Sequence, residues 1–470
     1  MPESDVIIVG GGVSGLATAY FLGQFGIRSV LIEKSNRLGG LIQTNRIEGC
    51  LLEAGPDSFL GAKPAVTELA RNIQGLSGQI IGSNDAARRI FVVRSGQPVP
   101  LPRGMAMMVP THWSQVFGSN IFSPRTKVRF FSETFMRPRI RSEDVSVGEF
   151  VKDHFGPELL DEMVEPLLAG VYGGNSGGLS ARSVLPRFVG YEQNYGSLIR
   201  GVRRERRSAP AGSLFLSFRE GMQTLTDALA EAARDHVTVM HAEATQVKRS
   251  RAASKGKWVA HTSEGSVESQ NVVLACPTYR AAALLETQSP DLAADLAAIP
   301  YSSAILVTLG YQRAQLGHTP EGFGFLAPTA ERGTIAAATW IHTKFPTRIP
   351  PDLGAVRAFI VAENAKRLLK ATDAALIELV RSDLERFMNV DADPLFSTVH
   401  IWPDSMPQYV VGHEHRVRRI GVAVQNEPGL YLTGNAYDGV GVPDCIRLAK
   451  ETAKGIRSRL QREQVGSGVV

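Results

Sequence analysis

The chain has 470 residues, of which 43% are hydrophobic and 21% are charged. This balance excludes a disordered or fibrous protein, and the length suggests two or more lobes. The formal net charge is +5, but residues 124–141 and 200–207 together carry +9, so the rest of the chain carries −4. The positive charge is therefore local, which calls for a local explanation.

The sequence does not predict secretion or a membrane span. Its start is acidic and leads into a short apolar run that ends at Gly10, whereas a signal peptide needs a basic start and a longer apolar stretch. No apolar run reaches the length of a transmembrane helix. Cys50, Cys276 and Cys445 form no CxxC pair, which supports neither a disulfide framework nor a zinc site. We therefore expect a cytoplasmic protein.

The first 33 residues predict a βαβ unit. Residues 6–9 are a continuous apolar run, which is typical of a strand buried on both faces. Three glycines then break the run, and apolar residues at helical spacing follow over residues 13–25. Residues 29–33 predict a second buried strand that ends at an acid, Glu33. Strand, helix and strand in this order indicate a parallel α/β sheet.

The remaining elements alternate between helical and strand-like patterns. Residues 105–185 mix Met, Trp and Phe with bases at helix-like spacing and predict a helical lobe. Later segments predict a loop at 208–213, a helix at 221–234, strands at 237–247, 257–262 and 305–309, a helix at 373–387, a strand at 430–432 and a long final helix. The chain thus begins and ends with pieces of one α/β sheet.

The turn after the first strand carries the pattern Gly10-x-Gly12-x-x-Gly15, with Val13 and Ser14 opening the helix. The first glycine permits the tight turn, the second lets a pyrophosphate approach the backbone, and the third lets helix and strand pack closely. Free N–H groups at the helix N-terminus favour phosphate. Glu33 lies where an acid binds ribose hydroxyls, which disfavours NADP. We predict a dinucleotide site.

Further glycine-rich turns distinguish FAD from NAD. Each of them alone would be an ordinary turn, but their joint placement around one nucleotide fold favours FAD. The last helix begins with Pro and Asp, and its N-terminus could stabilise negative charge on a flavin. Besides residues 10–15 and Glu33, the predicted cofactor-binding residues are Lys34, Arg37, Gly39, Gly40, Gly55, Pro56, Asp57, Ser58, Gly434, Asn435, Val440, Gly441 and Val442.

These segments resemble the FAD-dependent protoporphyrinogen oxidase family, which belongs to the larger flavin amine oxidase-like group. Residues 10–40, Gly55-Pro56 and 434–445 carry the resemblance, and residues 170–180, 321–328 and 438–445 narrow it to this family. The resemblance covers nearly the whole chain and is weakest over residues 105–140.

The family resemblance implies the fold class and the division of the chain. It implies an α/β protein with a Rossmann-like FAD-binding domain, split over residues 1–75, 212–290 and 400–470. An α+β substrate-binding domain takes residues 76–104, 186–211 and 291–399. A mainly helical insert takes residues 105–185.

The resemblance also implies an activity and a set of site residues. The family converts protoporphyrinogen IX to protoporphyrin IX in heme biosynthesis, a six-electron oxidation in which O2 is the acceptor and H2O2 is produced. It binds FAD non-covalently, so we interpret Cys445 as a buried thiol. Arg89 matches the residue that binds a propionate, because a guanidinium offers a planar fork to a carboxylate. The other matched positions are Phe323, Leu326 and Phe359 on the faces of the macrocycle, the backbone of Gly174 near its pyrroles, and Val247 and Trp402 near the flavin.

Residues 124–141 and their neighbouring aromatics fit two interpretations. An amphipathic helix could lie on the inner face of the cell membrane, as the family resemblance suggests, or the same pattern could be an ordinary solvated helix. Nucleic-acid binding is not expected, since no known binding motif accompanies the arginines. The sequence neither predicts nor excludes a homodimer. The arginines of residues 200–207 have no assigned purpose at this stage.

Three other functions stay open. A coproporphyrinogen III oxidase of the same family would need more bases around the substrate, and Arg88, Arg94 and Arg103 lie near Arg89 in the sequence. A flavin amine oxidase would need an aromatic cage, for which Tyr437 is one wall. A non-enzymatic FAD-binding scaffold would turn over no porphyrinogen.

Proton transfer and metal binding have little support in the sequence. No convincing general base appears. His413 and His415 would face one way on a strand, as metal ligands do, but without a third ligand a polar surface is favoured.

Overall fold

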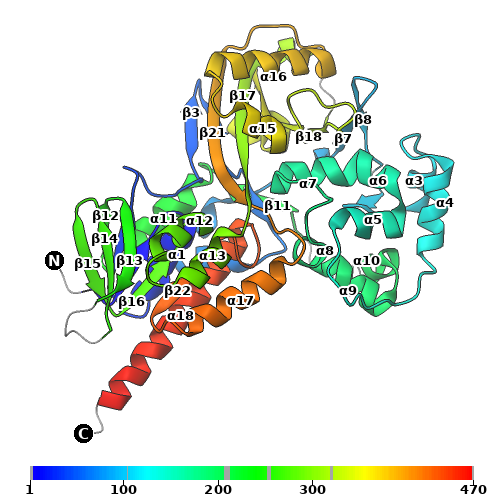
Figure 1. Ribbon diagram of the computed structural model, residues 1–470. Coiled ribbons are helices and arrows are strands. Elements are labelled where there is room, and N and C mark those ends of the chain that lie inside the picture. Colours follow the sequence, from blue (N-terminus) through cyan, green and yellow to red (C-terminus); the bar gives the residue numbers. More distant parts are fainter. Residues whose placement is uncertain (1–3, 103, 206–211, 251–255, 318–320, 468–470) are drawn as a thin grey trace.

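The computed structural model describes residues 4–102, 104–205, 212–250, 256–317 and 321–467. The described part forms three bodies (Figure 1). One is built around a parallel sheet and contains both ends of the chain, the second around a large mixed sheet, and the third is helical.

The first body confirms the predicted parallel α/β sheet. Its five strands are all parallel, and β1 lies at the centre because its residues are apolar on both faces. The strand order is β12 (Val237–His241), β2 (Ser29–Glu33), β1 (Val6–Val9), β16 (Asn271–Leu274) and β22 (Leu430–Leu432). Segments from the two ends of the chain and from its middle therefore share one sheet.

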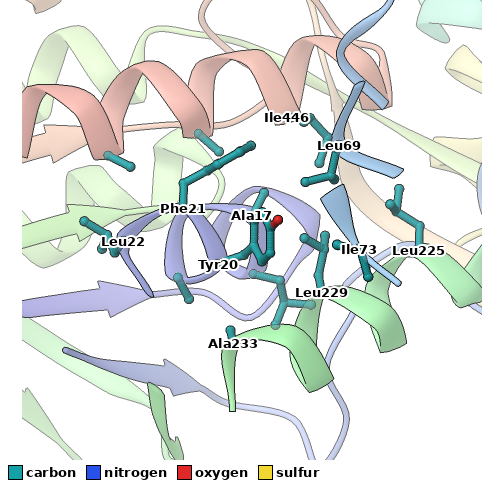
Figure 2. Close-up of a cluster of buried hydrophobic side chains, with 14 of the residues drawn as sticks. Ala17, Tyr20, Phe21, Leu22, Leu69, Ile73, Leu225, Leu229, Ala233 and Ile446 are labelled. Atoms are coloured by element: carbon teal, nitrogen blue, oxygen red, sulfur yellow. The ribbon is translucent and has the colours of Figure 1, made fainter. Parts of the chain in front are cut away.

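Four helices cover one face of this sheet. They are α1 (Val13–Gly23), α2 (Ala65–Asn72), α11 (Gln223–Ala233) and α18 (Val442–Ser467). Figure 2 shows their apolar side chains meeting around α1, with Tyr20 and Phe21 at the centre of the cluster. Val6 and Ile8 of β1 belong to this core, whereas Ile7 and Val9 face the other side.

A second layer closes the opposite face. It consists of a small antiparallel sheet and three helices, and it buries Trp258 and Leu285 completely. These elements are β13 (Ala244–Arg249), β14 (Trp258–Thr262), β15 (Gly265–Ser269), α12 (Thr278–Leu285), α13 (Pro290–Ala297) and α17 (His413–Gln425).

The second body is a seven-stranded mixed sheet. The order of its strands is β21 (Phe396–Pro407), β17 (Tyr301–Gln312), β20 (Leu353–Val361), β19 (Ala337–Trp340), β18 (Gly324–Leu326), β7 (Ile90–Arg94) and β8 (Gln97–Pro100). Helices α15 (Ala362–Leu368) and α16 (Asp373–Met388) pack on one face through Phe325, Val307 and Leu384. The strand predicted at 305–309 and the helix predicted at 373–387 are thereby confirmed.

The third body is the helical lobe predicted at residues 105–185. Its core contains Phe130, Phe150 and Phe155, and the rings of Phe130 and Phe155 meet edge-on. Its elements are the hairpin β9 (Met105–Ala106) and β10 (Val109–Pro110), α3 (Trp113–Phe117), α4 (Pro124–Glu133), α5 (Val147–Phe155), α6 (Pro157–Leu159), the π-helical turn Leu160–Val164, α7 (Glu165–Tyr172), α8 (Ala181–Val184), α9 (Pro186–Tyr195) and α10 (Leu198–Glu205). Leu198 and Val202 share this core, which favours a lobe that runs to residue 205. The predicted division into domains remains a prediction.

Short elements connect the three bodies. They are β3 (Thr44–Ile47), β4 (Cys50–Glu53), β5 (Phe59–Leu60), β6 (Ile80–Gly82), β11 (Phe215–Phe218) and α14 (Ile341–Lys344), with short 3-10 turns at Ser77–Gln79, Asp85–Ala87, Arg313–Leu316 and Pro346–Arg348. The strands β5, β11 and β6 form one small antiparallel sheet.

The described arginines of residues 200–207 have partners inside the helical lobe. Arg200 donates hydrogen bonds to the backbone carbonyls of Met136 and Tyr195. The guanidinium groups of Arg203 and Arg204 lie over the rings of Trp113 and Tyr195, at 5.3 and 5.4 Å. Arg206 and Arg207 lie outside the described residues. The described part of this charge cluster therefore contributes to packing within the lobe.

Helix α4 and the segment that follows it carry exposed apolar side chains. Phe131, Phe135 and Ile140 are 57%, 67% and 82% exposed and lie among the bases of residues 124–141. Both predicted interpretations, a membrane-surface helix and a solvated helix, stay open. Within the described residues, no helix combines the length and apolar character that crossing a membrane requires.

Candidate functional site

The turn between β1 and α1 gives each of its three glycines a different physical role. Gly10 has φ +110°, and a Cβ there would lie 2.6 Å from the Ala275 carbonyl oxygen. A Cβ on Gly15 would collide with the Gly10 carbonyl oxygen. At Gly12, in contrast, the nearest atom to an added Cβ is the Gly40 Cα at 3.9 Å. Gly12 therefore borders a gap, as expected where a pyrophosphate approaches the backbone.

Residues around this gap support the predicted nucleotide-binding role. Glu33 ends β2, and its Oε2 accepts a hydrogen bond of 2.7 Å from the Gly11 N–H. The Gly39 N–H donates to the Gly11 carbonyl oxygen at 2.8 Å, which holds the second glycine-rich turn against the first. Helix α1 begins at Val13, followed by the buried Ser14, and no side chain caps its N-terminus. Its free N–H groups therefore remain available to a phosphate.

Arg37 and Lys34 differ in their surroundings. Arg37 donates to the backbone carbonyls of Leu38, Gly40 and Ile42, so its guanidinium braces the turn that carries Gly39 and Gly40. Lys34 is exposed beside Glu33. The sequence predicts a base near the pyrophosphate. Arg37 lies near that region, where its guanidinium holds the backbone of the Gly39 and Gly40 turn in place.

The C-terminal glycine-rich segment is held by a tyrosine that the sequence analysis missed. The Tyr409 hydroxyl donates to the Asn435 carbonyl oxygen at 2.7 Å and accepts a hydrogen bond from the Gly439 N–H at 2.9 Å. Gly434 has φ +140°, and no protein atom lies within 4 Å of an added Cβ. The segment thus borders open space, like Gly12.

The last helix begins where the sequence predicted. Helix α18 starts at Val442, directly after Val440 and Gly441. Asp444 lies in its first turn, accepts a hydrogen bond from the Gly441 N–H and pairs with Lys63 at 2.6 Å. Cys445 is buried, as predicted, and burial raises the pKa of its thiol to about 11.

The turn at Gly55, Pro56, Asp57 and Ser58 contacts the large sheet through a buried group of charges. A Cβ on Gly55 would collide with the Leu41 carbonyl oxygen, so this turn packs directly on the Gly40 turn. We define the junction cluster as Glu53, Asp57, Lys344, Arg348 and Arg357. Its closest contacts are Lys344 to Asp57 at 2.8 Å, Arg348 to Glu53 at 3.1 Å and Arg357 to Asp57 at 3.7 Å.

Within the junction cluster, the pKa values of the two carboxyl groups are shifted in opposite directions. Burial alone would raise the pKa of Asp57, but Lys344 and Arg357 hold it well below its usual range. Burial raises the pKa of Glu53, and Arg348 offsets this only in part. The side chain of Arg357 also donates to the Gly55 carbonyl oxygen and lies 4.9 Å from the centre of the Phe359 ring. It therefore connects the predicted flavin turn with a predicted substrate residue.

The strand register explains which residues share the open face of the large sheet. Leu326 pairs with Ala337, Ala337 with Phe359, and Phe359 with Leu306. Directly paired residues point to the same side of a sheet, so these side chains form one apolar row. Their neighbours Phe325 and Ala358 point the other way, into the core under α16. The row therefore faces away from α16, on the side of the Gly55 turn.

Arg89 and Phe323 lie together at one end of this row. The Phe323 N–H donates to the Arg89 carbonyl oxygen at 2.8 Å, because β7 and β18 run parallel and both residues precede their strands. Phe323 is buried, whereas the Arg89 side chain is exposed and has no ion pair within the described residues. Arg94 donates to the carbonyls of Asn120 and Ile121, Arg88 is exposed, and Arg103 lies outside the described residues.

The other predicted site residues are more dispersed. Gly174 follows α7, and a Cβ there would collide with the Gln408 Oε1, so its backbone is pressed against the end of β21. The Trp402 Nε1 donates to the Ala54 carbonyl oxygen at 2.6 Å, next to the Gly55 turn. Val247 is fully buried on β13, in the small sheet behind the parallel sheet. The roles assigned to these residues remain predictions.

The interpretation of His413 and His415 as a polar strand surface is wrong. Helix α17 begins at His413, and residues two apart on a helix do not face the same way. His413 is 1% exposed and stacks on Tyr409 with ring centres 4.0 Å apart. Burial lowers the pKa of His413 to about 4, so it is neutral at pH 7. In the described part of the chain, no group of three or more His, Cys, Asp or Glu could hold a metal ion.

The fold and the gap beside Gly12 define the class as dinucleotide-binding proteins. Comparisons with known proteins show which family of this class the chain resembles. The family described as flavin containing amine oxidoreductase matches residues 13–457. The coproporphyrinogen III oxidases of Staphylococcus aureus and Bacillus subtilis are 31% and 30% identical, over 97% and 95% of this chain and 99% and 97% of theirs. A solved structure of a candidate protoporphyrinogen oxidase from Exiguobacterium sp. 255-15 superimposes with a TM-score of 0.86 at 30% identity, covering 98% of this chain and 100% of that one.

The chain therefore belongs to the flavin containing amine oxidoreductase family and, within it, to the group of protoporphyrinogen and coproporphyrinogen oxidases. It is an oxidoreductase with FAD as its cofactor. The residues present fit this cofactor, because Gly12 and Gly434 border open space and Glu33 ends the second strand beside it. Bound FAD supplies the capacity to take up electrons, and the chain supplies position, burial and charge.

Proposed function

We propose that this protein oxidises a porphyrinogen to the corresponding porphyrin with O2 as the acceptor, as a step of heme biosynthesis. Each of three rounds removes two electrons and two protons from the macrocycle and reduces one O2 to one H2O2. The observation that carries the proposal is the apolar row of Leu326, Ala337, Phe359 and Leu306, next to the Gly55 turn.

A broad, largely apolar macrocycle suits this face for a physical reason. Leu326 and Phe359 offer dispersion contacts over a broad surface and exclude water from the reacting carbon. Arg89 at the end of the row offers an exposed guanidinium without an ion pair in the described residues, which can bind a substrate carboxylate. Arg357 fixes the distance between this face and the Gly55 turn. We assign no side chain as proton acceptor.

Protoporphyrinogen IX is the first candidate substrate, because the motifs at residues 170–180 and 321–328 resemble those of protoporphyrinogen oxidases. Coproporphyrinogen III is the second candidate. The Staphylococcus and Bacillus relatives, which match nearly the whole chain, carry the name of that activity. The two substrates differ in their number of carboxylates, so the bases around the site decide between them.

The test is a side-by-side assay of both porphyrinogens. The purified protein should be yellow, and porphyrin fluorescence should appear in air together with H2O2. The ratio of kcat/KM for the two substrates identifies the preferred one. A flavin-loaded protein that forms neither porphyrin would overturn the proposal.

Gly12→Ala tests whether the gap beside Gly12 receives the cofactor. The added Cβ lies 3.9 Å from the nearest protein atom, so the fold should tolerate it, but it fills the gap that the pyrophosphate needs. We expect a folded protein with FAD affinity reduced by about tenfold or more. Gly78→Ala places its Cβ more than 4 Å from any atom of the described residues and lies in the turn after α2, so this variant should bind FAD like the wild type. Equal FAD binding in both variants would argue against the assigned gap.

A further inference from the structure

Hydrogen bonds to three other segments hold the loop between β18 and β19 in place. The Asp383 carboxylate on α16 accepts hydrogen bonds from the backbone N–H groups of Thr334 and Ile335, at 2.6 and 2.8 Å. The Asn364 side chain donates to the Gly333 and Thr334 carbonyls, and the Glu331 carboxylate accepts from the Ser95 and Gly96 N–H groups. A loop held so firmly presents its side chains in fixed positions.

The loop contains Arg332, whose guanidinium forms no ion pair with a carboxylate of the described residues. Arg332 donates from its Nε to the Ala327 carbonyl oxygen at 3.3 Å, and its Nη2 is buried without a hydrogen-bond partner in the described residues. No described carboxylate lies within ion-pair distance. Glu165, at the start of α7, is close enough to influence its charge, but the Glu165 carboxylate already accepts a hydrogen bond from the Ser176 N–H.

Other arginines with a buried, unpartnered nitrogen are in a different situation. Arg348 and Arg357 form ion pairs within the junction cluster, and Arg459 pairs with Glu463 on α18. Arg416 lies on the outer helix α17, away from the sheet face. A buried donor atom without a partner costs free energy, so the half-buried Arg332 is suited to an anionic ligand that completes the contacts of its Nη2.

Hydrogen bonds place Arg332 beside the predicted substrate residues. Ala327 directly follows Leu326, the Ala327 N–H donates to the Ala336 carbonyl, and the Ala336 N–H donates to the Phe359 carbonyl. Ala336 also packs with Ala169 of α7, the helix that leads to Gly174. The guanidinium therefore lies between the apolar row and the helical lobe.

Arg332 and Arg89 lie at opposite ends of β18. Arg89 contacts Phe323, just before the strand, and Arg332 contacts Ala327, just after it. Four residues of extended chain separate these two contacts by about 13 Å. The two arginines are therefore anchored at opposite ends of the strand, and a macrocycle that covers the strand is broad enough to extend toward both, whereas a small amine is not.

We propose that Arg332 binds a second carboxylate of the substrate, on the edge opposite to the carboxylate bound by Arg89. This assignment rests on the proposed function. In protoporphyrinogen IX the two propionates sit on neighbouring rings, whereas coproporphyrinogen III carries one on each ring. Carboxylates on opposite edges therefore occur only in the second substrate, so Arg332 selects coproporphyrinogen III.

The experiment compares the wild type, Arg332→Gln and Arg332→Lys with both porphyrinogens, using the FAD-loaded enzyme in air. We expect Arg332→Gln to raise the KM for coproporphyrinogen III by about tenfold. Its kcat, and the KM for protoporphyrinogen IX, should change by less than about twofold. Arg332→Lys should recover part of the loss, since it keeps the charge but not the planar fork.

A binding measurement and a control separate this role from a structural one. Coproporphyrin III should raise the melting temperature of the wild type more than that of Arg332→Gln, although the unliganded variant loses no stability. Arg71→Gln, which changes an exposed arginine on α2, should leave both KM values unchanged.

The possible outcomes distinguish the two proposals. Wild-type turnover of coproporphyrinogen III with an unchanged KM in Arg332→Gln would overturn the role of Arg332 and leave the proposed function intact. An equal rise of both KM values would overturn the selectivity. A wild type that oxidises neither substrate would overturn the proposed function itself.

Discussion

The protein buries two groups of charged side chains, one beside the predicted binding residues and one inside the helical lobe. The junction cluster contains three cations and two carboxyl groups, and Glu53 has a raised pKa. We define the lobe cluster as Glu133, Arg141, His154 and Glu192. It holds two carboxyl groups against Arg141 and against His154, whose pKa the two carboxyl groups raise, and it lies in the core of the helical lobe.

The lobe cluster is balanced and closed. His154 lies between Glu133 at 3.0 Å and Glu192 at 3.3 Å, and Glu192 also pairs with Arg141 at 2.7 Å. Glu133 caps α10 by accepting from the Leu198 N–H at 2.6 Å. The cluster thus ties α4, α5, α9 and α10 together, and all its charges are used within the protein.

The junction cluster has a surplus of positive charge and borders the Gly55 turn. Arg357 donates to the Gly55 carbonyl oxygen and covers the Phe359 ring, so this cluster contacts two predicted binding elements at once. A surplus of positive charge suits a site that receives electrons from a substrate. We therefore expect the junction cluster, whose charges are not balanced, to serve function, and the lobe cluster, whose charges are balanced, to serve stability.

Glu192→Gln tests the structural cluster and should have the largest effect. It removes the buried carboxylate that pairs with Arg141 and one of the two carboxyl groups beside His154, and removing one partner of a buried pair costs about 3–5 kcal/mol. The free energy of unfolding of the helical lobe should fall by that amount, measured by circular dichroism during denaturant unfolding. FAD binding by the remaining folded protein should not change.

Asp153→Asn is the matched control for Glu192→Gln. Asp153 pairs with the same Arg141 at 3.0 Å, but its side chain is 43% exposed. Exposed pairs contribute less than about 1 kcal/mol, so the loss should be small. Loss of FAD by Glu192→Gln at temperatures where it is fully folded would show that the lobe cluster also serves the site.

Arg357→Lys tests the junction cluster and should affect function more than stability. Lysine keeps the charge near Asp57, but it cannot also hold the Gly55 carbonyl and cover Phe359. We expect a drop of about tenfold in FAD affinity and in kcat, with a loss of about 1 kcal/mol in stability. Fluorescence titration with FAD and the visible absorbance spectrum of the bound flavin measure this.

Arg386→Lys is the control for Arg357→Lys, because Arg386 also lies over a phenylalanine ring, Phe387, at 5.1 Å but is exposed on α16. It should bind FAD normally. If Arg357→Lys behaves like Arg386→Lys, the junction cluster is only structural and the contrast with the lobe cluster disappears.

The two regions also differ in how far the sequence predicts them. The Gly10 turn, Glu33 and the start of α18 are local patterns, so their positions follow from periodicity and glycine spacing. Arg357 and Lys344 join Asp57 only through contacts across almost 300 residues, which no local pattern contains. One signal was present: Arg357 is the single charge in the apolar strand β20, and such a residue needs a buried partner.

His413 shows the opposite error. Its spacing from His415 fitted a strand, but a helix begins there because Gly412, with φ +84°, turns the chain. The partner that decides its role, Tyr409, lies four residues earlier and stacks on it only in the folded chain. Spacing alone cannot reveal a contact that depends on this turn.

The smallest expected effect is the pH dependence of stability in the lobe cluster, which tests whether its charges stabilise the helical lobe. Burial alone would raise the pKa of Glu192, but hydrogen bonds from His154 and Arg141 hold it at about 2, below its ordinary value of 4.5. Burial would lower the pKa of His154, but Glu133 and Glu192 raise it above 6.5. The lowered pKa of Glu192 stabilises the fold above pH 4.5, and this contribution is lost as the pH falls toward 2. The raised pKa of His154 stabilises the fold below pH 6.5, and this contribution is lost as the pH rises through its folded value.

The melting temperature of the helical lobe should therefore be highest between about pH 4.5 and 6.5. The difference in melting temperature between the wild type and Glu192→Gln should shrink as the pH falls from 4.5 toward 2, because both side chains are then uncharged. Asp57 also has a lowered pKa, so the junction cluster should lose stability in acid as well, and Arg357→Lys reports that part separately. A difference between the wild type and Glu192→Gln that stays constant down to pH 2 would mean that the charge of Glu192 does not stabilise the lobe, and the two clusters would then differ in location alone.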